Sequence, residues 1–369
     1  MNCEKVTNAE ELGEHAQMCR QDGTIMAMYG KGGDGKTTIA QTVICPALGL
    51  KGIEGEDFFK VNASGSAPSE VKGTGIPDME TREMFFSKPT KWPLHSRIGD
   101  RPCVLLLDEM PEWDVSVQSL CRSLFDPVGE RPMIGEHELS ANTFIVVTGN
   151  RRIDGSRSSI PSAPFVTRCT SFIWEPTLDA WLDWAADKGY ASSPVYTFLK
   201  YNGLDQFGRE GDFFSPPVPQ PWDGNPHPCP REWEACCKLT VEGSPDWSES
   251  VLRKNINGKV GKEAGQACYA FIQTVAKQLP LLDKIKAGDA DWPSNEADQF
   301  ALTHCALRQV KRDAGKDPEA AVASGSVDWL VERVLLPARN EIKEWGFKTA
   351  LSIGIPLDQH PRRVDLQGV

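Results

Sequence analysis

The sequence predicts an α/β protein whose core is a doubly wound parallel sheet, followed by a smaller all-helical domain. Apolar runs at 24–29, 102–109 and 143–150 lack the alternation of a half-exposed strand, which is typical of strands buried between two helical layers. They alternate with helical patterns up to about residue 176. Beyond that point the patterns are helical, so we expect a change of architecture there.

The predicted elements follow from these patterns in chain order. Strands are expected at 24–29, 61–63, 102–109, 143–150 and 172–174, with a Gly/Ser/Pro-rich loop at 64–78. Helices are expected at 8–20 (capped by Asn8), 38–43, 115–125, 178–185, 194–201, 231–240, 260–279, 297–312 and 328–345.

This pattern divides the chain into four parts. Residues 1–21 hold an N-terminal helix, and 22–176 form the α/β nucleotide-binding core. Residues 177–312 form a helical lid, interrupted by a Pro/Gly-rich loop insert at 207–230. A C-terminal helix and tail occupy 313–369.

Composition narrows the class of protein. The chain has 369 residues, 40% hydrophobic and 25% charged, as in ordinary soluble globular proteins. Its net charge of −11 gives no support for a surface that coats nucleic acid, although local basic loops are compatible with that charge. Eleven scattered cysteines without a C-x-x-C pair indicate reduced thiols. With no apolar leader and no run of membrane-spanning length, we expect a cytoplasmic protein without a membrane partner.

Residues 30–37 read Gly-Lys-Gly-Gly-Asp-Gly-Lys-Thr, which is the G-x-x-x-x-G-K-T phosphate-binding pattern between a strand and a helix. Glycines let backbone N–H groups turn towards an anion, and the helix adds its positive end. Lys36 would reach the β- and γ-phosphates, and the Thr37 hydroxyl would bind Mg²⁺. A Gly-rich turn without a ligand is the alternative. The residues expected at the nucleotide are Gly30, Lys31, Gly32, Gly33, Asp34, Gly35, Lys36, Thr37 and Thr38.

Two acids end the strand predicted at 102–109. Ligands of open α/β sheets bind at the carboxyl ends of the strands, which is where Asp108 and Glu109 are expected. Asp108 can hold Mg²⁺, and Glu109 can polarise a water for attack on the γ-phosphate. The alternative is a pair of acids that only caps a turn or helix.

Three further residues are candidates for the same chemistry. Asn150 ends a neighbouring strand, where its amide can contact the γ-phosphate or the attacking water, although a turn asparagine is the alternative. Arg168 is a candidate arginine finger directed at a neighbouring subunit. Arg231 begins a lid helix and could sense the γ-phosphate. For Arg168 the alternative is a surface salt bridge, and the local rivals of both arginines are Arg151, Arg152 and Arg157.

These residues, in this order, resemble those of an AAA+ ATPase, specifically of the MoxR branch. The resemblance covers about residues 20 to 310. Beyond the phosphate loop it rests on the segments 73–78, 91–93, 108–118, 148–151, 160–168, 175–181, 230–233, 258–261 and 270–271.

The resemblance implies an ATP hydrolase with ATP and Mg²⁺ as cofactors. It further implies a homo-oligomeric ring, usually a hexamer, that remodels or matures a protein partner, often one with a von Willebrand factor A (VWA) domain. The implied roles are phosphate binding by Lys36, Mg²⁺ binding by Thr37 and Asp108, activation of water by Glu109, sensor 1 for Asn150, the finger acting in trans for Arg168 and sensor 2 for Arg231.

One segment departs from the MoxR pattern. The loop Lys31-Gly32-Gly33-Asp34-Gly35-Lys36-Thr37 resembles the deviant Walker A loop of ParA/MinD-type dimeric switches, in which the first lysine reaches the partner's nucleotide. That class normally lacks a glutamate directly after the Walker B aspartate and has no helical lid. A nucleic-acid motor and a nucleotide-binding scaffold without turnover are the other readings. ATP-dependent mass, salt-dependent DNA stimulation and phosphate release distinguish them.

Overall fold

The computed structural model divides near Thr177 into two compact units. Apart from the short stretch 218–223, the second unit comprises Leu178–Pro217 and Gly224–Val369. The structure describes residues 3–125, 131–154, 156, 158–159, 163–203, 213–218, 223–241, 243–314, 322 and 325–367.

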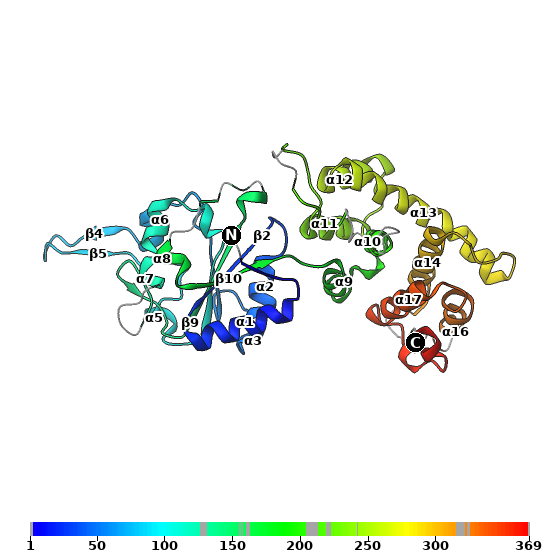
Figure 1. Cartoon of the computed structure of the whole chain (residues 1–369), viewed down its shortest axis with the longest axis horizontal. Coiled ribbons are helices and arrows are strands. Elements are labelled where there is room, and N and C mark those ends of the chain that lie inside the picture. The colour runs from blue at the N-terminus through cyan, green and yellow to red at the C-terminus, as the bar shows by residue number, and fades with distance from the viewer. Residues whose placement is uncertain are drawn as a thin grey trace. The chain divides into compact units, whose positions relative to one another are not determined.

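The first unit is built on a six-stranded parallel sheet with the strand order β1-β10-β2-β9-β6-β3 (Figure 1). The predicted α/β class with a parallel sheet is thereby confirmed. The strands are β1 (Glu4–Val6), β2 (Ile25–Gly30), β3 (Phe58–Val61), β6 (Cys103–Leu107), β9 (Thr143–Asn150) and β10 (Cys169–Trp174).

Both faces of this sheet are covered. Alternate side chains of β2 belong to two different apolar clusters, with Ile25 and Ala27 on one face and Met26 and Met28 on the other. The first cluster includes residues of α6 (Val115–Leu120) and α7 (Arg122–Phe125), and the second includes residues of α1 (Ala9–Asp22). Figure 1 shows these helices on opposite sides of the sheet. Burial on both faces explains why the strands read as continuous apolar runs.

The register brings three strand ends together. Gly30 of β2 pairs with Asn150 of β9, and Leu107 of β6 pairs with Val147 of the same β9. Since all three strands run parallel, the residues that follow β2 and β6 leave the sheet at the edge where β9 ends. This edge is where the candidate site lies.

Several predicted boundaries within the first unit are wrong. The second strand, β3, ends at Val61, where the prediction began it, because the buried Phe58 and Phe59 form the strand. The loop expected at 64–78 contains the helix α4 (Pro68–Lys72) and a strand. The helix predicted at 38–43 is instead α2 (Lys36–Ile39), the π-helical turn η1 (Ala40–Ile44) and α3 (Cys45–Ala47), and the one at 115–125 divides into α6 and α7.

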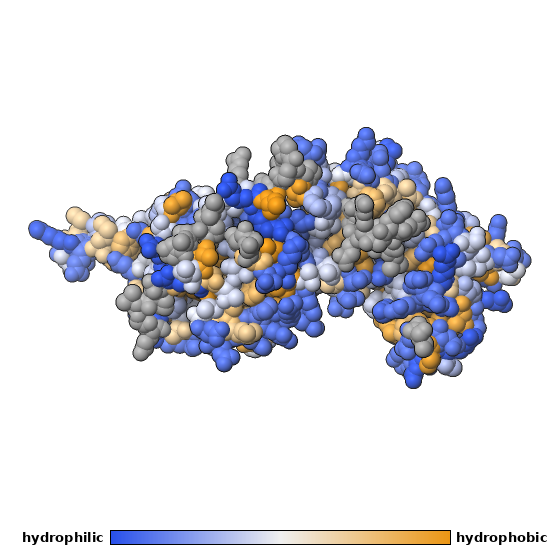
Figure 2. All heavy atoms as spheres, in the orientation of Figure 1, coloured by the Kyte–Doolittle hydropathy of each residue, from blue (hydrophilic) through white to orange (hydrophobic). Residues whose placement is uncertain are grey.

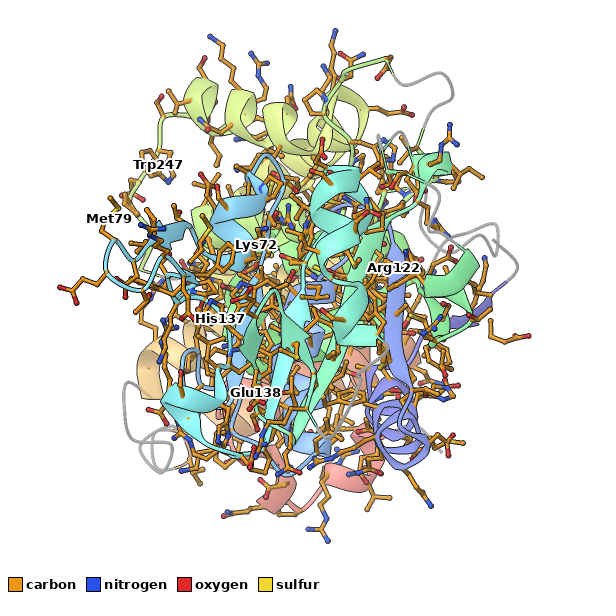
Figure 3. The ribbon with its side chains drawn as sticks, turned by 90° about the vertical axis from the view of Figure 1, so that its left-hand side faces the viewer. Lys72, Met79, Arg122, His137, Glu138 and Trp247 are labelled. Carbon is orange, nitrogen blue, oxygen red and sulfur yellow. The ribbon has the colours of Figure 1, made fainter. Side chains whose placement is uncertain are left out.

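Two small hairpins were not predicted. Strands β4 (Gly75–Pro77) and β5 (Met84–Phe86) form an antiparallel hairpin that projects from the unit (Figure 1), with apolar and hydrophilic side chains along it (Figure 2). Strands β7 (Met133–Ile134) and β8 (His137–Glu138) form the second. The ring nitrogen Nε2 of His137 lies 3.2 Å from the carbonyl oxygen of Ser87, beside the first hairpin. Figure 3 views the unit from the side of the β4–β5 hairpin and shows His137 and Lys72 on that side, with Met79 at its margin.

In the described residues of the second unit the regular elements are helices, and they pack around one apolar cluster that includes Phe198, Trp233 and Phe300. Its helices are α9 (Leu178–Asp187), η4 (Tyr190–Ser192), α10 (Pro194–Gly203), α11 (Pro230–Thr240), α12 (Glu249–Val260), α13 (Lys262–Ala287), α14 (Glu296–Ala314), α16 (Ser326–Trp329), η5 (Leu330–Leu335), α17 (Asn340–Ser352), η6 (Leu357–Gln359) and α18 (Arg363–Leu366).

Two predicted helices of the second unit are wrong in extent. The helix expected at 260–279 is α13, which begins after Gly261 (φ 81°) and runs on to Ala287, and α12 before that glycine was not predicted. The one expected at 328–345 breaks before α17, near Pro337. Residues 207–212 and 219–222 of the expected insert 207–230 lie outside the described residues. Among the helices that are described, none has the length and apolar character needed to cross a bilayer.

Acid should destabilise the second unit through His304. Its ring is buried in α14, where Nδ1 lies 2.8 Å from the Thr197 hydroxyl, and burial with the nearby Arg308 charge lowers its pKa to about 3. An unfolded histidine titrates near 6.5, so the unfolded chain binds the extra proton first. Stability is therefore full above pH 6.5 and falls as the pH drops towards 3, by up to about 1.4 kcal/mol per pH unit.

Denaturant unfolding between pH 7 and 4, followed by tryptophan fluorescence, measures this effect. His304→Gln should flatten the pH dependence, whereas His15→Gln in the first unit should leave it unchanged. Parallel profiles for His304→Gln and the wild type would contradict the assignment.

Candidate nucleotide-binding site

The loop between β2 and α2 has the backbone that its glycines were predicted to allow. Gly33 and Gly35 adopt left-handed φ values of 90° and 80°. Gly30 has no room for a side chain, because a Cβ there would lie 2.6 Å from the carbonyl oxygen of Trp174. The loop is therefore shaped by these three positions and lies against the end of β10.

Lys36 points into this loop. Its side chain is 7% exposed, and Nζ donates to the carbonyl oxygens of Gly30 (3.0 Å) and Lys31 (2.6 Å) and to Oδ1 of Asn150 (3.0 Å). Burial lowers the pKa of Lys36 to about 8, an effect that the nearby Asp34 and Asp108 oppose. An ammonium with three exchangeable acceptors is thus present where the sequence placed a phosphate contact.

Asp34 is buried and holds the backbone of the loop. Its carboxylate is 3% exposed, with Oδ2 accepting from the backbone N–H of Lys31 at 3.1 Å. The indole N–H of Trp174 donates to its carbonyl oxygen at 2.7 Å. Burial raises the pKa of Asp34 to about 6, against the opposing charges of Lys31 and Lys36. The side chain therefore shapes the loop from beneath.

Asp108 and Thr37 face each other across the site. The Thr37 hydroxyl donates to Oδ1 of Asp108 at 3.0 Å, and the Thr148 hydroxyl donates to the same oxygen at 2.7 Å. The Trp113 indole N–H fixes the Asp108 carbonyl at 3.0 Å. Carboxylate and hydroxyl oxygens suit Mg²⁺, which usually takes one or two carboxylates and completes its shell with water and phosphate. The described residues contain no cluster of three or more His, Cys, Asp or Glu that could hold a metal.

Glu109 has an unusual backbone conformation. Its φ of 56° is left-handed for a residue with a side chain, and its N–H donates to the Thr148 hydroxyl at 3.2 Å. Its carboxylate accepts from the amide of Asn62 at 3.1 Å. Asn62 was not predicted as a site residue. Its signal was its place directly after β3, the strand beside β6.

Asn150 connects Lys36 to a second group of residues. Its Nδ2 donates to Oε1 of Glu112 at 3.1 Å, while its Oδ1 accepts from Lys36. The same Glu112 oxygen accepts from the Ser156 hydroxyl at 2.6 Å. Neither Glu112 nor Ser156 was singled out from the sequence, because neither belongs to a recognisable motif.

The arginines separate by position. Arg151 is engaged within the first unit, donating to Asp154 at 2.6 and 3.0 Å and to Glu175 at 2.7 Å. Arg152 is exposed, and Arg157 lies outside the described residues. Arg231 lies at the start of α11 in the second unit, and its sensor role remains a prediction.

Arg168 lies at the amino ends of the parallel strands, whereas the phosphate loop of the same chain lies at their carboxyl ends. It directly precedes β10, and its carbonyl oxygen accepts from the N–H of Ile25, the first residue of β2. The loop follows Gly30 at the other end of that strand. At about 3.3 Å per residue, the length of β2 separates the two by roughly 17 Å. Arg168 is therefore unsuited to its own site, and a role in catalysis requires a second subunit.

Comparison with known proteins gives a distant structural likeness. No protein-family model matches the chain, and no curated protein matches it. Similar solved structures include Hsp104 in a closed state with ATPγS and casein (15% identity, TM-score 0.36, 48% of this chain), where the match spans only 35% of the Hsp104 chain. NtrX from Brucella abortus is 17% identical with a TM-score of 0.34 over 95% of this chain and 69% of its own. A RuvB mutant from Thermotoga maritima is 12% identical with a TM-score of 0.31, covering 89% and 86%. The function proposed below rests on the residues of the site.

Binding of a phosphate anion should draw a proton onto Lys36. With a pKa of about 8 in the free protein, part of the Lys36 population is neutral at pH 8.5, and a bound triphosphate favours the charged form. Binding of a Mg²⁺-saturated ATP analogue should therefore take up protons at pH 8.5 and few at pH 7. Calorimetry in buffers of different ionisation enthalpy counts them. Equal uptake at both pH values would contradict the assignment.

Proposed function

We propose that this chain is a Mg²⁺-dependent ATP hydrolase of the AAA+ type, resembling the MoxR branch. The observation that carries the proposal is the 3.0 Å hydrogen bond from Thr37 of the phosphate loop to Asp108, with Glu109 next to it in the chain. An acidic pair on the far side of the sheet would have been incompatible with this chemistry. Asp108 instead lies directly against the loop.

Each residue has a defined task in this proposal. Thr37 and Asp108 would hold Mg²⁺, which supplies neutralisation of the charge on the phosphate oxygens. Lys36 exchanges its carbonyl partners for phosphate oxygens. Glu109 orients the attacking water and accepts its proton, and Asn150 lies beside Lys36 to contact the γ-phosphate or that water.

The place of Arg168 supports assembly with a neighbouring copy. A finger about 17 Å from its own loop can stabilise transition-state charge only in a neighbouring copy. The MoxR resemblance makes a hexamer our proposed assembly.

The proposed partner is another protein, with a VWA-domain protein as the first candidate. The β4–β5 hairpin offers a surface for it, since four large apolar side chains are exposed there: Ile76 (41%), Met79 (86%), Met84 (59%) and Phe85 (52%).

A ParA/MinD-like dimeric switch is the second candidate, favoured by Lys31 at the start of the loop. In the structure the backbone of Lys31 is part of the loop, donating to Asp34 and accepting from Lys36. Lys31→Ala should reduce ATP turnover severely in a dimer that needs this lysine and mildly in a ring. Mass in solution with an ATP analogue separates a sandwich dimer from a ring directly.

Removing the proposed base should uncouple binding from turnover. Glu109→Gln keeps the shape and the contact with Asn62 but cannot accept a proton, so ATP should remain bound while phosphate release falls on the order of 10²-fold or more. Retention of labelled ATP after rapid gel filtration measures the first quantity, and a phosphate assay the second. Glu136→Gln, in the exposed turn between β7 and β8, is the matched control. Wild-type turnover by Glu109→Gln would refute the assignment.

Mixing two inactive variants tests the finger in trans. Arg168→Ala should retain ATP binding but lose turnover on the order of 10²-fold or more, because the neighbouring site lacks its cation. When mixed with Glu109→Gln, intact Arg168 from one variant meets intact Glu109 from the other, and activity should return in part. The absence of complementation in particles shown by mass to be mixed, or full activity of an Arg168→Ala monomer, would contradict the role.

A further inference from the structure

Glu112 is a carboxylate at the site that the proposed hydrolysis does not use. It ends the 3-10 turn η2 (Met110–Glu112), three residues after Glu109. Its Oε1 accepts from the Asn150 amide at 3.1 Å and from the Ser156 hydroxyl at 2.6 Å. A carboxylate with these partners faces the same asparagine that contacts Lys36.

The approach of Glu112 to Asn150 depends on close packing of η2 against β9. A Cβ at Gly149 would lie 2.7 Å from Cγ of Pro111 and 3.1 Å from Cδ1 of Tyr29, so only glycine permits this contact. The N–H and hydroxyl of Ser159 both donate to the Pro111 carbonyl at 2.8 Å and hold the other side of the turn. Glu112 is thus fixed in place by its surroundings.

The chemistry of the two groups determines which way the Asn150 amide points. An ionised carboxylate only accepts hydrogen bonds, whereas an amide has a donating end and an accepting end. Glu112 therefore selects the orientation with Nδ2 towards itself. Oδ1 is left facing Lys36, at 3.0 Å from Nζ. If the amide were flipped, Oδ1 of Asn150 would face the Glu112 carboxylate and Nδ2 would face the Lys36 ammonium. Acceptor would then meet acceptor, and donor would meet donor.

Glu112 is also linked to the backbone of Asn150 through two serines. Ser156, which donates to Glu112, accepts from the N–H of Ser158 at 3.0 Å, and the Ser158 hydroxyl donates to the Asn150 carbonyl oxygen at 2.8 Å. Side chain and main chain of Asn150 are therefore both held when Lys36 exchanges its partners for phosphate oxygens.

We propose that Glu112 is the positioning residue of Asn150, fixing the amide orientation on which the proposed ATP hydrolysis depends. This inference rests on the proposed function. Glu112 acts through Asn150, so its removal should affect turnover more than the binding of ATP, most of whose contacts lie in the phosphate loop.

A double-mutant cycle on ATP turnover by the full chain tests this role. Glu112→Ala should lower kcat roughly tenfold or more, a factor of ten being about 1.4 kcal/mol, with KM changed less than about twofold. Glu112→Gln keeps an acceptor for Nδ2 and should recover most of the loss. In the Asn150→Ala background, Glu112→Ala should lower kcat no further, because its effect passes through the missing amide.

The alternative is that Glu112 only stabilises the fold. Losses in kcat that multiply in the double variant, or a rise in KM and a fall in unfolding midpoint without a fall in kcat, would overturn the positioning role. Glu136→Ala should match the wild type in all of these measurements.

Failure of the proposed function gives a different result. A wild-type chain that binds ATP but does not hydrolyse it would refute the proposed hydrolase function, whereas the contact between Glu112 and Asn150 would still be open to test. The wild type, Glu112→Ala, Asn150→Ala and the double variant then test the contact through their midpoints of denaturant unfolding. Non-additive shifts for Glu112→Ala and Asn150→Ala would support the fixed amide, and additive shifts would overturn it.

Discussion

A lysine ammonium enclosed by a loop of glycines is the interaction on which the site depends. Burying an ammonium is costly unless each of its donors is satisfied, and Lys36 finds three acceptors in Gly30, Lys31 and Asn150. Two of these are backbone carbonyls, so the loop itself stabilises the charge. Phosphate oxygens are stronger acceptors than carbonyls because they are charged. The free loop thus keeps an anion-binding charge in position.

The acids around this lysine explain why a metal belongs to the proposed site. Asp34 beneath the loop and Asp108 beside it both favour the charged form of Lys36. However, a triphosphate brought next to Asp108 and Glu109 would meet like charge. A divalent cation between Asp108 and the phosphates converts this repulsion into attraction. The hydroxyls of Thr37 and Thr148 both donate to Oδ1 of Asp108, the residue that would hold such a cation.

The sequence was sufficient for features that depend on local pattern. The apolar run ending at Asp108 predicts a buried strand, and the glycine spacing of the loop predicts that the candidate site lies at the carboxyl ends of the strands. It could not identify Asn62 or Glu112, since their roles arise from strand neighbours and from a Gly149 contact that has no local signature. Hairpins of two- and three-residue strands, such as β4–β5, are too short for a periodicity. The helix α12, which ends just before Gly261, was not predicted at all.

The parallel register has a consequence for how the proposed activity is controlled. Because β2 and β10 run in the same direction, a residue before β10 and a loop after β2 must lie at opposite edges of the sheet. Arg168 and Lys36 therefore cannot serve one phosphate group in a single copy. If Arg168 is the finger, each site is complete only when a second copy supplies it. ATP turnover then requires assembly, because the strand direction keeps Arg168 and the phosphate loop of one copy too far apart for any side-chain movement to bring them together.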